Sequence, residues 1–186
     1  EGWTAPENSR TKDIHARLTL RPLIGRGAPL SGFAVSVFGS TGASDTLAHR
    51  TRQRFIGQVA YEHRYAFAAA EFLRAADAPA TLVSRQPSLA HSTDAEVIAQ
   101  GWSAFGWLDL GLLGKLPGVR VMGRVEHLDP DTHLAHNGHT RAIVGVGYEA
   151  SDFVQILLDG EFVNYEADAG VAHNERRLFV HASVGF

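Results

Sequence analysis

Apolar and polar residues alternate through the final segment of the chain, residues 176–186. Its apolar residues occupy every second position: Leu178, Val180, Ala182, Val184 and Phe186. The interleaved residues are small or polar, apart from Phe179. Because side chains of a strand point alternately to opposite faces, this spacing predicts a strand with one apolar face. A barrel strand in a membrane needs such an outward face. We therefore assign these five residues as the candidate membrane-facing side and assembly signal of a closing strand.

Eight upstream segments follow the same two-residue period and predict eight further strands. The nine predicted strands are residues 14–23, 32–40, 54–62, 65–74, 97–113, 119–128, 140–149, 153–165 and 176–186. The facing of residues 97–113 is ambiguous. Residues 65–74 lie in an alanine-rich stretch with high helix propensity, so a helix competes with a strand there. We favour the strand, because a tight connection joins this segment to the preceding one as in a hairpin.

The connections between these segments are expected to alternate in length. Residues 25–31, 63–64, 114–118 and 150–152 form the short set, and residues 41–50, 77–94, 129–139 and 166–174 form the long set. Outer-membrane barrels have short turns at one end and longer loops at the other. The sequence therefore predicts an all-β fold, an antiparallel up-and-down transmembrane β-barrel, as a single domain over residues 1–186. Residues 1–12 would be a loop or the end of a missing N-terminal part.

Composition narrows the function classes further. The 186 residues carry a formal net charge of -3, which gives no basic footprint for nucleic acid. No apolar stretch approaches the ~20 residues of a membrane helix, but barrel strands do not need one. The absence of cysteine excludes disulfides and thiolate metal sites and fits an envelope protein in an oxidising periplasm. We expect the bacterial outer membrane as the location.

Five stretches carry a resemblance to a known family. They are K-D-I-H-A-R-L-T-L-R-P-L (12–23), R-F-I-G-Q-V-A-Y-E-H-R-Y-A-F-A-A-A-E-F-L (54–73), A-Q-G-W-S-A-F-G-W-L (99–108), R-V-E-H-L-D-P-D-T (124–132) and the terminal strand. These stretches are spread over most of the chain, and in them the sequence resembles the C-terminal half of the phosphate-selective porins of Gram-negative outer membranes. The resemblance implies a trimeric sixteen-stranded channel with basic residues at its constriction.

The strand count departs from that family. Nine strands cannot close the even-numbered barrel that such proteins form. Either about seven N-terminal strands are missing from this chain, or a segment taken as one strand is two, with residues 94–113 the first candidate for a split. A basic ladder for phosphate is not established in this sequence, so phosphate specificity is not transferred.

Charged residues on the polar side of the predicted strands are the candidate pore lining: Arg17, Arg21, Arg54, Arg120, Arg124, Arg141, Glu126, Glu149, Asp159, Glu161 and Arg177. Opposed charges in a pore create a transverse field that selects small ions or solutes. Acids and bases are nearly balanced in this set. Ion pairing that rigidifies or plugs the lumen is therefore an equal alternative.

Metal binding and catalysis are not predicted. His133, His136 and His139 follow at three-residue spacing, but no helix aligns them as ligands. Asp129 and Asp131 favour a turn, since the glycine and distal glutamate of a calcium loop are missing. The sequence has no nucleophile elbow, phosphate loop or dinucleotide fingerprint. We predict no enzyme activity and no cofactor.

Five aromatic residues could form interfacial girdles or serve ordinary barrel packing: Trp102, Trp107, Tyr61, Tyr148 and Tyr165. The expected function is a porin-like channel for passive diffusion of small hydrophilic solutes or anions. Its expected partners are outer-membrane lipids and the barrel assembly machinery, and the resemblance implies a homotrimer. The alternative is a non-conducting barrel that acts as an envelope scaffold or accessory subunit. A soluble all-β binding domain is the third hypothesis.

Overall fold

A computed structural model describes residues 1–186 except 1–12, 28–29, 44–50, 78–96, 168–172 and 186. The described residues form nine strands and one short 3₁₀ helix, Leu30–Gly32. The strands are β1 (Ile14–Leu20), β2 (Phe33–Ala43), β3 (Thr51–His63), β4 (Ala66–Asp77), β5 (Val97–Asp109), β6 (Val119–Asp129), β7 (His139–Ser151), β8 (Val154–Tyr165) and β9 (Glu175–Val184). In these residues the fold is all-β, as predicted, and no helix there is long and apolar enough to span a membrane.

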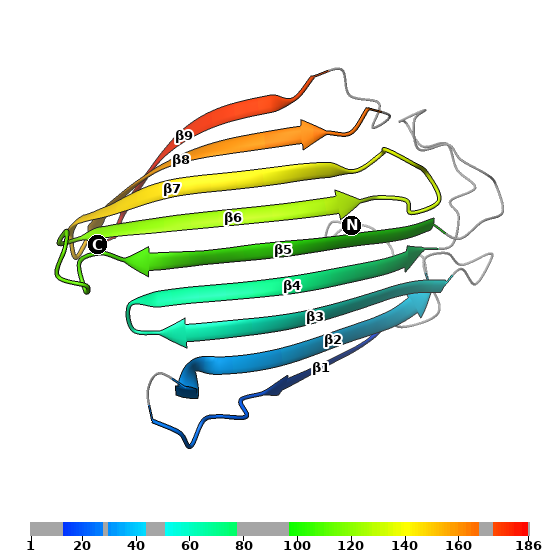
Figure 1. Cartoon of the computed structure of the whole chain (residues 1–186), viewed down its shortest axis with the longest axis horizontal. Helices are drawn as coiled ribbons and strands as arrows, with labels where there is room; N and C mark the ends of the chain where they lie inside the picture. The colour runs from blue at the N-terminus through cyan, green and yellow to red at the C-terminus, as the bar shows by residue number, and fades with distance from the viewer. Residues whose placement is uncertain (1–12, 28–29, 44–50, 78–96, 168–172, 186) are drawn as a thin grey trace.

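All nine strands belong to one antiparallel sheet whose spatial order is the order of the sequence (Figure 1). Each strand pairs only with its neighbours in the chain, so the predicted up-and-down arrangement is confirmed. Two of the turns contain only two residues, Arg64–Tyr65 and Asp152–Phe153. The sheet is curved but open, because β1 and β9 do not pair with each other.

Several predicted boundaries need correction. The segment 97–113 is one strand, not two, and it ends at Asp109. The Asp109 carboxylate accepts a hydrogen bond from the Leu112 backbone N–H at 2.8 Å and so holds the following turn. Gly114 and Gly118 in that turn have φ of 71° and 74°, a conformation that glycine adopts without strain. The alanine-rich segment 65–74 is strand, as we favoured, and extends to Asp77.

The expected alternation of short and long connections is only partly correct. The first connection covers residues 21–32, because β1 ends at Leu20. Pro22 cannot donate a ladder hydrogen bond, which explains why the strand does not reach the predicted residue 23. This connection is longer than residues 44–50, which join β2 to β3 at the opposite end of the sheet.

The register places the alternating residues on two chemically different faces. Leu18, Val37, Gly57, Phe72 and Trp102 are cross-strand partners in one row, and opposed residues of antiparallel strands share a face. We call the face that contains this row the convex face. Its exposed apolar side chains include Val35, Phe55, Val59, Val144, Val146, Ile156, Leu158, Phe162, Leu178 and Val180.

The opposite, concave face is polar and more crowded. Buried residues on it include Ser36, Ala69, Ser103, Asp159 and Glu161. Curvature brings side chains together on the inside of a sheet and spreads them on the outside, which explains the difference in burial. No large side chain is fully buried in the described residues. The described sheet therefore has no conventional hydrophobic core, and its apolar surface faces outward.

Candidate functional site

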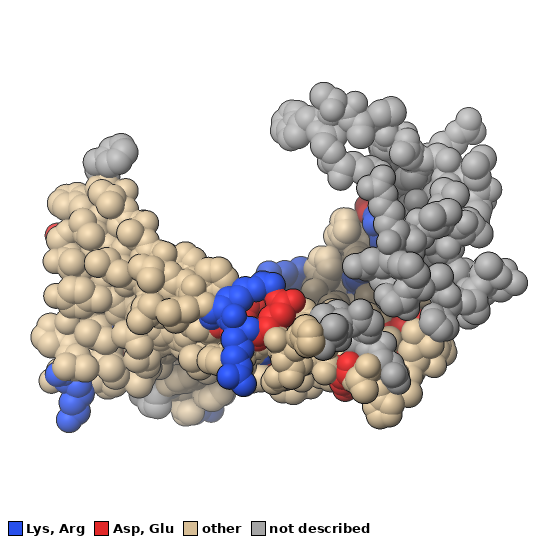
Figure 2. Space-filling view, turned by 90° about the horizontal axis from the view of Figure 1, so that it is seen from above, with Lys and Arg blue, Asp and Glu red and all other residues tan. Residues whose placement is uncertain are grey.

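Six alternating charges cross the concave face from β6 to β9. In spatial order they are Arg124, Glu126, Arg141, Glu161, Arg177 and Glu175, and we call this set the charge ladder. Figure 2 shows acidic and basic side chains gathered at the floor of the hollow. Three positive and three negative groups make the ladder neutral as a whole.

Some contacts of the charge ladder lie within one strand, and the others join neighbouring strands. Arg124 Nη2 lies 2.5 Å from Glu126 Oε2, and Arg141 Nη1 lies 3.3 Å from Glu126 Oε1. Arg141 Nε donates to Glu161 Oε1 at 2.5 Å, and Arg177 Nη1 lies 3.7 Å from Glu161 Oε2. Arg177 also pairs with Glu175 on its own strand. The ladder is therefore continuous over four strands.

The sequence builds this ladder through strand register. Glu126 is the direct cross-strand partner of Arg141, and Glu161 is the direct partner of Arg177. Opposite charges in such positions stabilise a strand pair, whereas like charges there destabilise it. A register shift of one residue would move these charges to the convex face. The ladder therefore also helps to specify the pairing of β6 with β7 and of β8 with β9.

The carboxylate of Glu161 is the most buried group of the ladder. Glu161 is 5% exposed, whereas the side chains of Arg141 and Arg177 are 38% and 52% exposed. Burying an unpaired carboxylate is costly, so its position between two guanidinium groups is a requirement of the fold. Nearby, the carboxylate of Asp159, 8% exposed, lies 2.9 Å from His181 Nε2.

Other ion pairs of the described residues lie nearer the ends of the strands, among them those of Arg54 and Arg120. At the loop end, Arg54 makes a bidentate pair with Asp77, both contacts being 2.7 Å. At the turn end, Arg120 Nη2 lies 3.2 Å from Asp109 and 3.4 Å from Glu149. These two arginines and every arginine of the charge ladder thus have at least one carboxylate partner.

The predicted lining residues fall largely on one face. Ten of the eleven are concave-face positions of the sheet, and Arg21 lies in the connection after β1. The predicted lining omitted three carboxylate partners, Asp77, Asp109 and Glu175. Each lies at a strand end, where loop and strand are hardest to separate by sequence. Only Glu175 carried a sequence signal, because it precedes the predicted lining residue Arg177 by two positions.

The apolar positions of the last strand share the convex face. Leu178 and Val180 are 74% and 71% exposed, and Ala182 and Val184 continue the same side. Phe186 lies outside the described residues. The alternation that predicted one apolar side of this strand is therefore correct from residue 178 to residue 184.

The histidine and aspartate cluster is a turn. No group of three or more potential ligands in the described residues could hold a metal ion. Asp131 Oδ1 accepts from the His133 backbone N–H and lies within 3.0 Å of its ring Nδ1, and Asp129 Oδ1 accepts from the Asp131 N–H at 3.1 Å. His139 lies in β7 and packs against Tyr165, with ring centroids 5.7 Å apart.

The predicted aromatic girdle is only partly consistent with the register. Tyr61, Trp102 and Tyr148 lie on the convex face, and Trp102 and Tyr148 are 47% and 48% exposed. Trp107 and Tyr165 lie on the concave face, because Trp107 opposes Met122 and Tyr165 opposes His139. These two residues therefore cannot belong to a girdle on the convex side.

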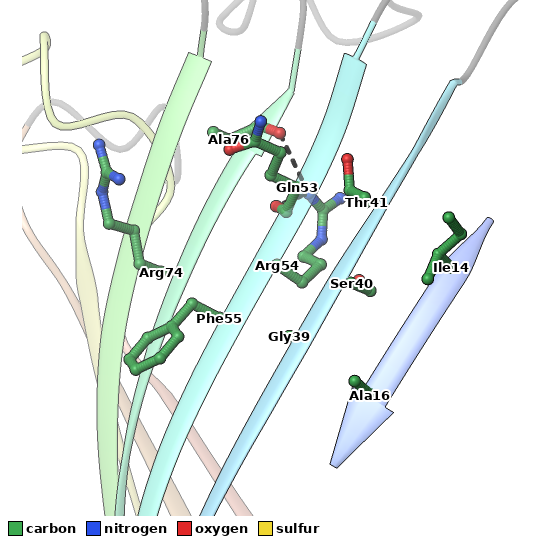
Figure 3. Close-up of a pocket in the computed structure, with 10 residues that line it drawn as sticks. All are labelled: Ile14, Ala16, Gly39, Ser40, Thr41, Gln53, Arg54, Phe55, Arg74 and Ala76. Atoms are coloured by element: carbon green, nitrogen blue, oxygen red, sulfur yellow. Dashed lines mark hydrogen bonds between the residues drawn. The ribbon is translucent and has the colours of Figure 1, made fainter.

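A hollow of about 410 Å³ lies at the loop end of β1–β4. Figure 3 shows its lining, in which Phe55 and Arg74 point away from Arg54. The Arg54 guanidinium is already engaged by Asp77 and by the Ala76 carbonyl, at 3.4 Å for the latter. A Cβ at Gly39 would meet no atom within 4 Å, so the glycine contributes to the depth of the hollow.

The chain matches no model of a known protein family, no curated protein and no solved structure.

Proposed function

We propose that this chain forms part of an outer-membrane β-barrel whose concave face lines a channel for small hydrophilic solutes. The observation that carries the proposal is the contrast between the two faces of one curved sheet. The convex face exposes valine, leucine and phenylalanine, and the concave face carries paired charges. Water on both faces would leave the convex surface unfavourably exposed, whereas lipid would cover it.

The apolar part of the convex face has dimensions that suit a bilayer. In β8 it extends from Val154 to Phe162, which at about 3.3 Å per residue covers about 26 Å along the strand. A tilt of about 40° would reduce this to about 20 Å, close to the apolar band of outer-membrane barrels, about 25 Å. Toward the loop end the convex positions become polar, with Gln100, Asp129 and Asn164.

Closure of the barrel requires additional strands. Because neighbouring strands are antiparallel and nine are present, β1 and β9 run in the same direction. Direct pairing of these two edges would be parallel. An odd number of further strands is needed to close the sheet with antiparallel pairs throughout, and a longer form of the protein would supply them.

The intact mass of the native protein, extracted from outer membranes with detergent, tests the proposal first. We expect a mass well above the 20.1 kDa of this chain, with fractionation in the outer membrane. The extracted protein should then give discrete conductance steps in a planar bilayer. Recovery of the protein in the aqueous fraction without detergent would overturn the membrane assignment.

The charge ladder favours one second candidate, a non-conducting barrel that serves as a scaffold. Its ion pairs cross-link four strands and would stiffen the wall of a barrel that has no open path. A bilayer experiment separates the two candidates. A protein that inserts into the outer membrane but gives no conductance steps would support the scaffold and exclude the channel.

A further inference from the structure

The turn-side half of the concave face contains a cavity of about 420 Å³, which we call the aromatic cavity. Strands β4 to β8 all contribute to its lining, so the curvature of the sheet creates it. Phe67, Phe105 and Trp107 provide three rings, and Arg120 and Arg124 provide two guanidinium groups. This combination of size, apolar rings and few polar groups is typical of small-molecule sites.

A glycine opens the aromatic cavity. Arg120, Gly147 and Leu157 are consecutive cross-strand partners in one row, so the missing side chain of Gly147 leaves a gap between the other two. A Cβ at Gly147 would lie 3.8 Å or more from its neighbours. The gap is therefore free space, and no backbone contact requires this glycine.

Ring packing and cation–π contacts fix the walls of the cavity. Phe67 and Phe105 pack with centroids 5.5 Å apart. The Arg120 guanidinium lies 4.9 Å from the Trp107 ring centroid, and that of Arg124 lies 6.0 Å from the centroid of Phe105. Side chains held in this way are pre-organised, so a ligand would lose little free energy in ordering them.

Arg120 carries a hydrogen-bond donor that has no acceptor among the described residues. Its Nε is buried and has no hydrogen-bond partner among the described residues, although Nη2 contacts Asp109 and Glu149. A buried donor without an acceptor is destabilising, and a ligand oxygen could satisfy it. Arg120 also lines the aromatic cavity, so this donor belongs to a residue of the cavity wall.

The charges around the cavity indicate the class of ligand. Asp109, Glu149 and Glu126 neutralise the two arginines, so an anion would meet carboxylates as well as guanidinium groups. We propose that the aromatic cavity binds an uncharged, ring-shaped organic solute that accepts a hydrogen bond from Arg120. A role for this site in solute passage rests on the proposed channel, but binding itself does not.

Tryptophan fluorescence in detergent solution tests the site with benzamide as the probe. Trp102 and Trp107 lie in the same strand on opposite faces. A variant with Trp3→Phe and Trp102→Phe reports on Trp107 alone, and its matched control carries Gly147→Leu in addition. We expect a saturable fluorescence change in the first variant only. Equal changes in both variants, or no saturation in the first, would overturn the proposal.

Cavity-filling variants provide the second readout, by calorimetric titration of benzamide. Gly147→Leu should abolish binding, and the matched convex-face variant Gly57→Leu, whose Cβ has its nearest neighbour at 3.8 Å, should bind as the unmodified protein does. Arg120→Lys should weaken binding about tenfold, since it keeps the charge but loses the Nε donor. Undiminished binding by Gly147→Leu would place the ligand elsewhere.

Two charged probes of similar size test the charge assignment. Benzoate and benzylamine should both bind more weakly than benzamide, and tighter binding of either would overturn the uncharged class. These measurements use detergent-solubilised protein, so failure of binding is distinct from failure of conductance in a bilayer. If benzamide binds in the aromatic cavity and the protein conducts, benzamide should reduce single-channel conductance in the unmodified protein but not in Gly147→Leu.

Discussion

Strand β5 carries one tryptophan on each face, and the two have different surroundings. Trp102 projects from the convex face opposite Phe72, and the residue is 47% exposed. Trp107 projects from the concave face, where Arg120 covers its ring. The same residue type, five positions apart, is thus exposed beside Phe72 and His127 in one case and half-buried against a guanidinium group in the other. The face of the sheet on which a tryptophan lies therefore determines its surroundings, although the residue type is the same.

The same contrast holds for the whole sheet. Most large apolar side chains of the convex face are exposed, whereas the concave face carries the paired charges, several of which are buried. A water-soluble sheet normally has the reverse arrangement, with apolar residues inside and polar residues outside. The inverted pattern is what the proposed lipid contact of the convex face would require, and on the concave face the charge ladder pairs its charges within the sheet. Substitutions matched between faces can break or sharpen this comparison.

The largest effect is expected from a charge on the convex face. Val59→Arg should lower the free energy of unfolding in lipid vesicles by about 2–4 kcal/mol, because an arginine near the bilayer midplane is destabilising. Gln58 lies next to Val59 but on the concave face, opposite Glu71, so Gln58→Arg should change the free energy of unfolding little. Urea titration of the reconstituted protein measures both. Equal stability of the two variants would remove the distinction between the faces.

A smaller effect is expected from the centre of the charge ladder. Glu161→Gln leaves Arg141 and Arg177 without their shared carboxylate and should cost about 2 kcal/mol, less than a fully buried pair because both arginines are partly exposed. If the proposed channel forms, the same variant should shift its reversal potential toward anion selectivity. Glu149→Gln, half exposed, is the control and should cost below about 1 kcal/mol. A destabilisation by Glu149→Gln as large as that by Glu161→Gln would contradict the central role of Glu161.

The smallest effect is expected at the loop end of the concave face. Asp77→Asn should lower the free energy of unfolding by about 0.5–1 kcal/mol, because the bidentate pair with Arg54 is partly exposed. High salt should reduce the difference between the variant and the unmodified protein. Chemical denaturation at low and high salt measures this difference. A salt-independent decrease above about 2 kcal/mol would show that the pair is shielded from solvent.

Much of the fold could be predicted from the sequence, because a two-residue period is a direct consequence of strand geometry. The facing of Leu178, Val180 and Val184 follows from their spacing alone. The end of β5 could not be predicted as easily, since Leu110 to Leu113 continue the apolar composition. A backbone hydrogen bond to Asp109 ends that strand, and composition does not encode such a contact.

The sequence predicted which face of the sheet carries the candidate site, but it did not predict the contacts between its residues. Alternation placed Arg141 and Glu161 on the same side, whereas their hydrogen bond depends on the register of β7 with β8. The aromatic cavity depends on the row Arg120, Gly147 and Leu157, which joins three strands. Register across several strands is set by turns and packing together, so a single sequence does not reveal such rows.

The meander order also determines how the sheet can grow during folding. Because strands pair only with chain neighbours, each pairing step closes one local loop, and the entropy cost of closure rises with loop length. The hairpins β3–β4 and β7–β8 have two-residue turns and are the segments we expect to form first. Strands β5 and β6 then join two preformed hairpins. Pulse-labelled hydrogen exchange should accordingly protect amides of β3, β4, β7 and β8 before those that link β5 to β6.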